Sequence, residues 1–386
     1  MKTRDKTLPI NPTGKINIAM AGGGTWGHVF PIRSLLQTLS SSSTYAEQIG
    51  TIYRFWSKDS LEQQTCNALQ DSSSIKISFL PIISGKLRRE LSLKAIFRNG
   101  SDFFKLLTGT VQSCHYLRKY QINTVFCKGG YVALPVVVAA KLLKKKLILH
   151  ESDTHPGLVN HIASRRANVN FTAFPNVLPN AQVVGQLLSD DLFASSNAKH
   201  HTSQLLHWEI SASKRPILFI MAGSQGAKTL YEVVAEILHR NQKITQAFQI
   251  VITLGQLNQE LRASFENIQD SHITICDFLS QSQMGEIYQQ ADLCITRGGT
   301  TSLAEQKLFN IKSIIVPLPR THDQADNAKR YAEHHADIVL DQNAPSFAWD
   351  LEQALLAHTQ YHKKAPSTSP LKQIQETKKL VIEAML

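Results

Sequence analysis

Short apolar runs alternate with amphipathic segments along most of the chain. Eight runs have the length and the β-branched content of buried strands, and each precedes a segment that is long and periodic enough for a helix. Alternating strands and helices form parallel sheets with helices on both faces, so the pattern predicts an α/β fold with doubly wound sheets. The expected strands are INIAM (16–20), NTVFC (123–127), LILH (147–150), ILFIM (217–221), QIVITL (249–254), ITICDF (273–278), DLCIT (292–296) and SIIVPL (313–318).

A glycine-rich pattern occurs twice, as MAGGGTWG from Met20 and as MAGSQGAK from Met221, each time between an expected strand and an expected helix. Because 386 residues are also too many for one ordinary core, we expect two Rossmann-like domains, residues 1–186 and 187–365. The boundary is placed after AQVVG, where the sequence turns polar and irregular. The tail predicts a closing helix within 366–386 that packs back on the first domain.

The composition is that of a soluble globular protein, with 42% hydrophobic and 18% charged residues. No apolar stretch reaches the roughly 18 residues that a bilayer span needs, and the N-terminus lacks the apolar segment of a signal peptide, so we expect the chain to stay in the cytoplasm. The five cysteines are scattered without metal-ligand spacing and are expected to be reduced. The net charge of +11 indicates an anionic partner, such as a membrane face or a phosphorylated substrate, unless the excess is only solvated surface. No nucleic-acid-binding module is visible, so no nucleic-acid partner is expected.

Three glycine-rich turns are expected at the carboxyl ends of strands, GGGTWGH (22–28), KGGYVALP (128–135) and GSQGA (223–227). Ligands of open α/β sheets bind at that edge, and a helix N-terminus presents free N–H groups to a phosphate, although tight turns also need glycine for steric reasons alone. The first turn matches the glycine spacing of a dinucleotide site, but Asp59 lies too far along to bind its ribose, and no GK[ST] follows any turn. The turns therefore predict phosphate or sugar sites on another nucleotide-binding scaffold.

Six motifs resemble, in order and approximate spacing, those of the MurG family: GGTWGHVFP, KGGYVALP, HESDTHPGLVN, GSQGAK, RGGTTSLAE and PLPRTHDQADNA. Members of that family are peripheral-membrane N-acetylglucosaminyltransferases that complete lipid II, the last cytoplasmic peptidoglycan precursor. The resemblance covers about residues 15 to 345. It implies the GT-B fold, in which two Rossmann-like domains face each other across a central cleft.

The resemblance also implies that the donor, UDP-N-acetylglucosamine, binds mainly to the C-terminal domain. Glu305 would accept hydrogen bonds from the ribose hydroxyls, and Gln324, with Asn327 beside it, would bind the sugar. The other implied donor contacts are Ser224, Gln225 and Gly226 at the diphosphate, Thr25, Thr301 and Ser302 near the phosphates, and Phe278 and Leu279 at the uracil.

The implied acceptor is a lipid-linked muramyl-pentapeptide diphosphate on the N-terminal domain. The neutral imidazole of His28 would remove the proton of the attacking 4-hydroxyl while UDP leaves with inversion, or else His28 only caps its helix or contacts a phosphate. Glu151 and Asp153 stand where the family usually has a glutamine–asparagine pair and would orient the sugar, assist the base, or only cap the next segment, whereas His150 is expected in the core. The implied acceptor contacts are Gly24, Thr25, Gly27, Gly129, Gly130, Tyr131, Asp153 and Asn160.

No metal or other cofactor is expected, because the Glu333–His334–His335 run lacks a third ligand and no Asp-x-Asp motif is present. Two positions depart from the family pattern. Trp26 replaces a glycine of the first turn, and Ser189 stands where the family has an arginine that helps to bind the donor diphosphate. Either Arg297 or Arg320 substitutes for that arginine, or the donor is held differently.

The segment from Pro81 to Leu107 interleaves basic and apolar residues. Such a pattern suits an anionic leaflet, and the acceptor's polyprenyl tail must stay in the bilayer; the alternative is a helical hairpin with its apolar side in the core. We therefore expect a peripheral protein on the cytoplasmic face of the inner membrane, with cell-wall synthesis enzymes as possible partners. The residues are Lys86, Leu87, Arg88, Arg89, Leu93, Lys94, Ile96, Phe97, Arg98, Phe103, Phe104 and Lys105.

The sequence thus predicts an inverting, metal-independent transferase that moves N-acetylglucosamine from UDP to a lipid-linked muramyl acceptor. Two alternatives stay open. One is a GT-B transferase with another lipid acceptor, such as diacylglycerol, and the other is a non-catalytic nucleotide-sugar-binding or membrane scaffold protein.

Overall fold

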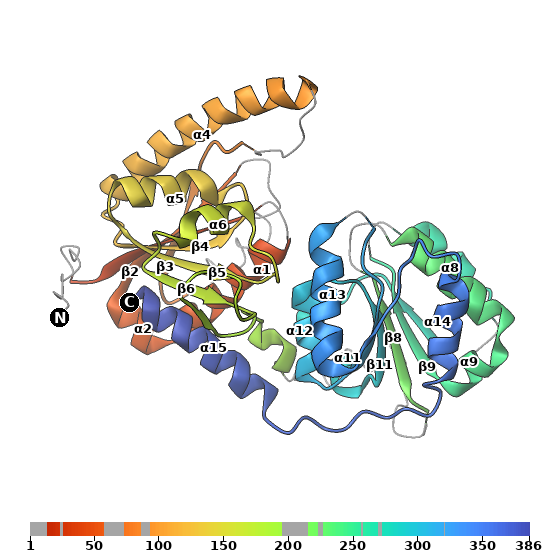
Figure 1. Cartoon of the computed structure of the whole chain (residues 1–386). Coiled ribbons are helices and arrows are strands. Elements are labelled where there is room, and N and C mark those ends of the chain that lie inside the picture. Colours follow the sequence, from red (N-terminus) through yellow and green to blue (C-terminus); the bar gives the residue numbers. More distant parts are fainter. Residues whose placement is uncertain are drawn as a thin grey trace. The chain divides into compact units, whose positions relative to one another are not determined.

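A computed structural model of the chain contains two compact units, which are described separately (Figure 1). One comprises Met1–Ser189 with Ile374–Leu386, and the other Asp190–Gln373. The structure describes residues 14–23, 26–57, 73–85, 93–194, 215–222, 227–255, 258–268, 272–319 and 321–386, without the side chains of 26, 93–99 and 322.

The first unit is built on a parallel sheet of seven strands in the order β3-β2-β1-β4-β5-β6-β7. Its strands are β1 (Ile16–Gly22), β2 (Ile49–Trp56), β3 (Lys76–Pro81), β4 (Thr124–Gly129), β5 (Lys146–Glu151), β6 (Val169–Thr172) and β7 (Ala181–Val183). Its helices are α1 (Trp26–Ser41), α2 (Ser43–Gln48), α4 (Leu93–Lys119), α5 (Ala133–Leu142), α6 (Leu158–Ser164) and most of α15 (Pro370–Met385).

Successive residues of the central strand β4 enter different cores, as expected for a strand buried on both faces. Val125 packs with α5 residues on one face, whereas Phe126 packs with α1 residues on the other. The closing helix α15 covers the α1 face, where Val381 joins the core and the hydroxyl of Thr377 donates to the Val184 carbonyl at 2.7 Å.

The second unit has a parallel sheet of six strands in the order β10-β9-β8-β11-β12-β13. Its strands are β8 (Ile217–Met221), β9 (Gln249–Thr253), β10 (Ile273–Cys276), β11 (Leu293–Thr296), β12 (Lys312–Ile315) and β13 (Ile338–Val339). Its helical segments are η1 (Asp190–Phe193), α8 (Lys228–Arg240), α9 (Gln242–Ala247), η3 (Gln259–Leu261), α10 (Arg262–Glu266), α11 (Gln281–Gln290), α12 (Thr300–Leu308), α13 (His322–His335) and α14 (Phe347–Leu356).

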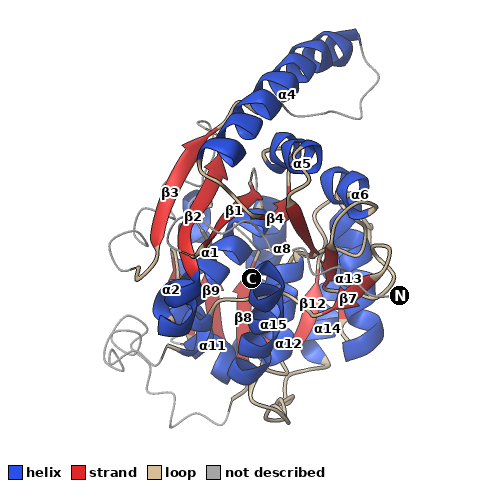
Figure 2. Ribbon diagram, turned by 90° about the vertical axis from the view of Figure 1, so that its left-hand side faces the viewer, coloured by secondary structure: helices blue, strands red, loops and turns tan. Residues whose placement is uncertain are grey.

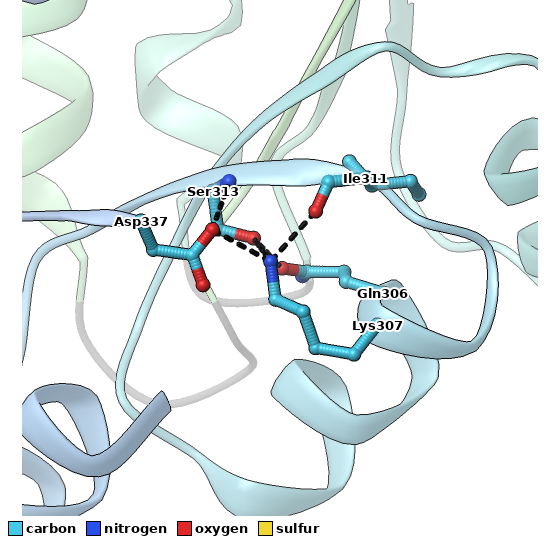
Figure 3. A network of polar contacts seen from close by, with 5 residues as sticks. All are labelled: Gln306, Lys307, Ile311, Ser313 and Asp337. Atoms are coloured by element: carbon cyan, nitrogen blue, oxygen red, sulfur yellow. Dashed lines mark hydrogen bonds and ion pairs between the residues drawn. The ribbon is translucent and has the colours of Figure 1, made fainter. Parts of the chain in front are cut away.

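A buried ion pair fastens α12 to the second sheet (Figure 3). The ammonium of Lys307 donates to Asp337 at 2.7 Å, to the hydroxyl of Ser313 at 3.0 Å and to the Ile311 carbonyl at 2.6 Å. The same serine hydroxyl donates to the Gln306 side chain at 2.8 Å. Because Ile311 lies in the α12–β12 connection, Ser313 lies on β12 and Asp337 directly precedes β13, the network fastens the C-terminal end of α12 to the sheet.

All eight strands expected from the sequence are present, and the two parallel sheets with helices on both faces confirm the predicted α/β class. In the described part of the chain, no helix has the length and apolarity to cross a bilayer.

Candidate functional site

The glycine-rich turns follow the central pair of strands in each sheet. In the first unit they follow β1 and β4, and in the second they follow β8 and β11. Strand order reverses at these pairs, and ligands of open α/β sheets bind at such switch points. Each unit therefore carries one candidate site at the carboxyl edge of its sheet.

In the first unit the backbone approaches itself so closely that side chains are excluded. Gly130 has a φ of +81°, and a Cβ there would lie 2.1 Å from the Gly23 carbonyl oxygen and 3.1 Å from Nδ1 of His28. Gly129, with a φ of +101°, and Gly22 are similarly enclosed. The two turns and His28 are therefore one packed constellation.

His28 lies in the first turn of α1, partly buried beside this constellation. Burial, together with the positive charges of Lys128 and Arg54, lowers the pKa of His28 to about 3, although a hydrogen bond to the backbone of Gly23 opposes the shift. The imidazole is consequently neutral at physiological pH, as a base requires.

Two buried cations lie beneath the turns. Arg54 on β2 is fully buried and donates to the carbonyls of Met20 at 3.1 Å, of Phe55 at 3.0 Å and of Gly22. Lys128 at the end of β4 is also buried and donates to the Ser152 hydroxyl at 2.6 Å. Arg54 thus holds backbone segments at the edge of the sheet, whereas Lys128 contacts a side chain, and both bring positive charge to His28.

Asn160 and Glu151 form the polar support of the same edge. Glu151 accepts from the backbone N–H groups of Ser152 at 2.7 Å and Gly157 at 2.9 Å, and from the Asn160 amide at 3.0 Å. The amide of Asn160 is buried and also approaches the carbonyls of Lys128 and His150. Both side chains thus act inside the unit and shape the loop before α6.

The remaining acceptor residues of the first unit are more accessible. Gly27 is exposed, while Tyr131 and Asp153 are partly exposed. Buried His150 has a lowered pKa of about 3, chiefly because of burial, and its Nε2 lies 2.9 Å from the Gly185 carbonyl oxygen, the environment expected of a core histidine. Gly24 and Thr25 lie outside the described residues.

In the second unit, Glu305 on α12 is a buried carboxyl group. Burial raises its pKa to about 7, and the hydroxyl of Tyr288 on α11, which donates to Oε2 at 3.3 Å, opposes the shift. Thr301 and Ser302, one helical turn earlier, are partly exposed at the start of α12. The predicted ribose and phosphate contacts therefore lie along one short helix.

Gln324 joins two turns at this edge. Its Oε1 accepts from the backbone N–H groups of Gly298 at 3.2 Å and Leu318 at 3.0 Å, so it couples the start of α12 to the loop before α13. Asn327, one turn further along α13, is buried. Leu279 is buried in the β10–α11 loop, whereas the neighbouring Phe278 is 73% exposed.

Arg297, one candidate for replacing the family arginine, is directed into the second unit. Its Nη1 donates to the Val316 carbonyl at 3.1 Å and to the Gln342 side chain at 2.7 Å. The hydroxyl of Ser189 donates to the Gln37 side chain at 3.3 Å. The described residues do not include the other candidate, Arg320, or the donor turn of Ser224, Gln225 and Gly226.

Sequence reasoning missed three buried side chains at these edges, Arg54, Lys128 and Tyr288. A charged residue inside a run such as IGTIYRFW, or directly before a glycine pair, is a signal that could have indicated the first two. Nothing in the sequence marks Tyr288. Among the described residues, no group of three or more His, Cys, Asp and Glu side chains could hold a metal ion.

Models of known families match both units. Residues 18–172 match the glycosyltransferase family 28 N-terminal domain, and residues 217–385 match the glycosyltransferase family 28 C-terminal domain. Together the two models span most of the chain.

Individual proteins are similar along nearly the whole length. The UDP-N-acetylglucosamine–N-acetylmuramyl-(pentapeptide) pyrophosphoryl-undecaprenol N-acetylglucosamine transferase of Staphylococcus aureus strain JH9 is 33% identical over 333 residues, which cover 84% of this chain and 86% of the relative. The crystal structure of Acinetobacter baumannii MurG matches with a TM-score of 0.66 at 24% identity, covering 95% and 99% of the two chains. The UDP-GlcNAc 2-epimerase of Neisseria meningitidis bound to UDP-GlcNAc matches with a TM-score of 0.61 at 11% identity, covering 96% and 99%.

The structural matches confirm the GT-B fold that the sequence motifs imply. With both family 28 domains and a relative at this identity, the chain belongs to glycosyltransferase family 28 and, within it, to the MurG family of glycosyltransferases.

Proposed function

We propose that the protein transfers N-acetylglucosamine from UDP-N-acetylglucosamine to a lipid-linked N-acetylmuramyl-pentapeptide, as the names of its relatives describe. We further propose that the acceptor group is the 4-hydroxyl and that the anomeric carbon is inverted. The observation that carries the proposal is the neutral His28 at the switch point of the first sheet, packed against the Gly130 turn. That turn and its neighbour would hold the acceptor diphosphate.

In the proposed step, the imidazole of His28 takes the proton of the acceptor hydroxyl. The oxygen attacks C1 of the sugar from the face opposite the leaving group, and the bond from C1 to the β-phosphate oxygen breaks with its electron pair going to UDP. The charge that develops on the diphosphate would be met by the N–H groups at the N-terminus of α8, without a metal ion.

The acceptor itself would activate the base. A pKa of about 3 leaves His28 neutral but weakly basic. Opposite charge favours the protonated form, so an acceptor diphosphate on the adjacent turns would raise the pKa of His28 toward the working pH. The positive charges of Lys128 and Arg54 would then serve two purposes, keeping the imidazole of His28 neutral before the acceptor binds and attracting the anionic acceptor.

We also propose that α4 attaches the first unit to an anionic membrane. Its N-terminal end projects away from the sheet of its unit in two views (Figure 1, Figure 2). Phe104 is 70% and Phe103 is 52% exposed, whereas the polar side chains of Asp102 and Ser113 are buried. The apolar groups of this part of α4 thus face outward, which supports a membrane role over the hairpin alternative. Residues 86–92 lie outside the described part.

The membrane proposal is tested by flotation with vesicles that contain phosphatidylglycerol. Replacing both Phe103 and Phe104 by serine should reduce the bound fraction severalfold, since each exposed aromatic side chain contributes apolar area to insertion. Trp349→Ser is the matched control, because Trp349 is 62% exposed but lies on α14 of the second unit. Equal binding of all variants would refute a membrane role for α4.

The catalytic proposal is tested with radiolabelled UDP-N-acetylglucosamine and a short-chain lipid I analogue. We expect a β-linked disaccharide product, identified by the anomeric coupling in its NMR spectrum, and no product with a diacylglycerol acceptor. Product on diacylglycerol alone would assign another lipid acceptor, and UDP binding without product on either would support a scaffold protein.

A further inference from the structure

Tyr288 is a fully buried tyrosine whose hydroxyl reaches the end of β8 and the carboxyl of Glu305. It donates to Oε2 of Glu305 at 3.3 Å and lies 3.2 Å from the sulfur of Met221. Met221 is the last residue of β8, directly ahead of the turn to which the donor diphosphate is assigned. The phenol therefore links the end of β8 to the carboxyl group of Glu305 on α12.

The orientation of this phenol is fixed by aromatic packing. The ring of Tyr288 meets Phe219 of β8 edge to face, with centroids 6.0 Å apart, and lies 5.8 Å from the ring of Phe309 at the end of α12. Such contacts restrict the ring to one position, so its hydroxyl is a preorganised donor. Burial and the charge of Glu305 hold the pKa of Tyr288 well above its ordinary value, and the proton stays on the phenol.

A second buried tyrosine provides an internal comparison. The hydroxyl of Tyr231 on α8 accepts from the backbone N–H of Ala222 at 3.1 Å and donates to the Thr253 carbonyl. It thus fixes the same strand end as Tyr288, but through backbone groups, whereas Tyr288 is the tyrosine that bonds Glu305 in the described part of the chain. Removing the Tyr231 hydroxyl therefore disturbs only the ends of β8 and β9, whereas removing the Tyr288 hydroxyl also takes a hydrogen bond from the carboxyl group.

We propose that Tyr288 is a positioning residue for donor recognition, which orients the Glu305 carboxyl group toward the ribose hydroxyls of a uridine diphosphate sugar and favours its ionised form. The inference rests on the proposed function, because it takes Glu305 as the ribose contact. A carboxyl group in an apolar interior loses its charge unless a donor supports it, and the described structure gives Glu305 one side-chain donor, Tyr288. Without that hydroxyl, the carboxyl would be protonated more readily and free to turn.

The test compares UDP-N-acetylglucosamine with its 2′-deoxyribose analogue in steady-state kinetics of the full chain. For Tyr288→Phe we expect KM for the natural donor to rise about 3- to 10-fold with kcat changed less than about 2-fold, and the preference for the natural donor to shrink by a similar factor. Tyr231→Phe should raise KM for both donors equally and leave their ratio unchanged. A merely structural role for Tyr288 would give the Tyr231→Phe pattern and would overturn the inference.

Glu305→Gln separates the inference from the proposed function. It should abolish the preference for the natural donor, and the double variant with Tyr288→Phe should then behave as Glu305→Gln alone, because both changes act through one group. If Glu305→Gln loses the preference for the natural donor but Tyr288→Phe retains it, only the role of Tyr288 is refuted. If Glu305→Gln retains the preference, Glu305 is not the ribose contact and the inference is overturned, whereas the proposed transfer fails only if the wild type forms no product.

Discussion

The two sheets present opposite chemistry at equivalent edges. Beside the first, the buried cations Arg54 and Lys128 help to hold the pKa of His28 at about 3, so a potential base is kept uncharged. Beside the second, burial raises the pKa of Glu305 to about 7, and a tyrosine hydroxyl opposes the shift. The same strand–turn–helix plan thus carries a neutral imidazole in one unit and a carboxyl group in the other. Function resides in the side chains placed at the turns and not in the fold that they share.

Among variants that remove one of these contrasting side chains, the largest loss of activity is expected at His28. His28→Ala should reduce kcat by about 10²- to 10⁴-fold, the usual contribution of a general base, while the KM for the donor changes little. Steady-state kinetics with both substrates varied measure this. A decrease below about tenfold would leave His28 only the capping or phosphate-contact role.

The units also differ in how their site helices are fastened. The α12 helix is held by the buried pair Lys307–Asp337, so Lys307→Met should lower the free energy of unfolding of the second unit by about 3–5 kcal/mol, because it leaves a buried carboxylate unpaired. Exposed Lys228, 4.0 Å from Glu232, provides the control, and Lys228→Met should cost less than about 1 kcal/mol. In Lys307→Met, amide hydrogen exchange should become faster in α12 but not in α1. If α12 exchanges equally fast in Lys307→Met and Lys228→Met, the pair does not fasten α12.

A smaller effect distinguishes the turns themselves. Gly130→Ala should cost about 1–3 kcal/mol in thermal unfolding, since the new Cβ meets a backbone oxygen and the residue has a positive φ. Gly299, at the equivalent place before α12, has a φ of −74° and open space around it, so Gly299→Ala should change stability by less than about 0.5 kcal/mol. If Gly130→Ala and Gly299→Ala were equally stable, the turn after β4 would have to open to admit a side chain.

The smallest effect is a pH dependence that only the second unit should show. An ionised Glu305 accepts hydrogen bonds from the ribose more strongly than the protonated acid does, so the donor binds the ionised form more tightly. Affinity for UDP-N-acetylglucosamine should therefore fall as the pH decreases, by up to about tenfold per unit, and should level off above the pKa of about 7. The donor's diphosphate is esterified at both ends and His28 has a pKa of about 3, so neither titrates in this window. Calorimetry between pH 5.5 and 8.5 measures the affinity for the donor. If Glu305→Gln showed the same dependence of affinity on pH as the wild type, the dependence would not arise from Glu305.

Hydrophobic patterning was sufficient to predict the two sheets because their central strands are buried on both faces and therefore apolar throughout. It did not indicate β2, β3, β6, β7 or β13. Of these, β3, β7 and β13 lie at sheet edges, β6 is short, and β2 is interrupted by polar residues such as Arg54. Glycine spacing located the turns, because Gly130 has no room for a side chain. Lys128 and Tyr288 could not be identified from the sequence, since their importance depends on which groups the fold brings next to them.

The placement of the donor on the second unit and of the base on the first is tested most directly by calorimetric titration of UDP-N-acetylglucosamine into the wild type, His28→Ala and Glu305→Gln. We predict that His28→Ala binds the donor as the wild type does, and that Glu305→Gln binds it about 10- to 100-fold more weakly, the loss expected for hydrogen bonds to a charged group. A His28→Ala protein that loses donor affinity, or a Glu305→Gln protein that retains it, would contradict this division.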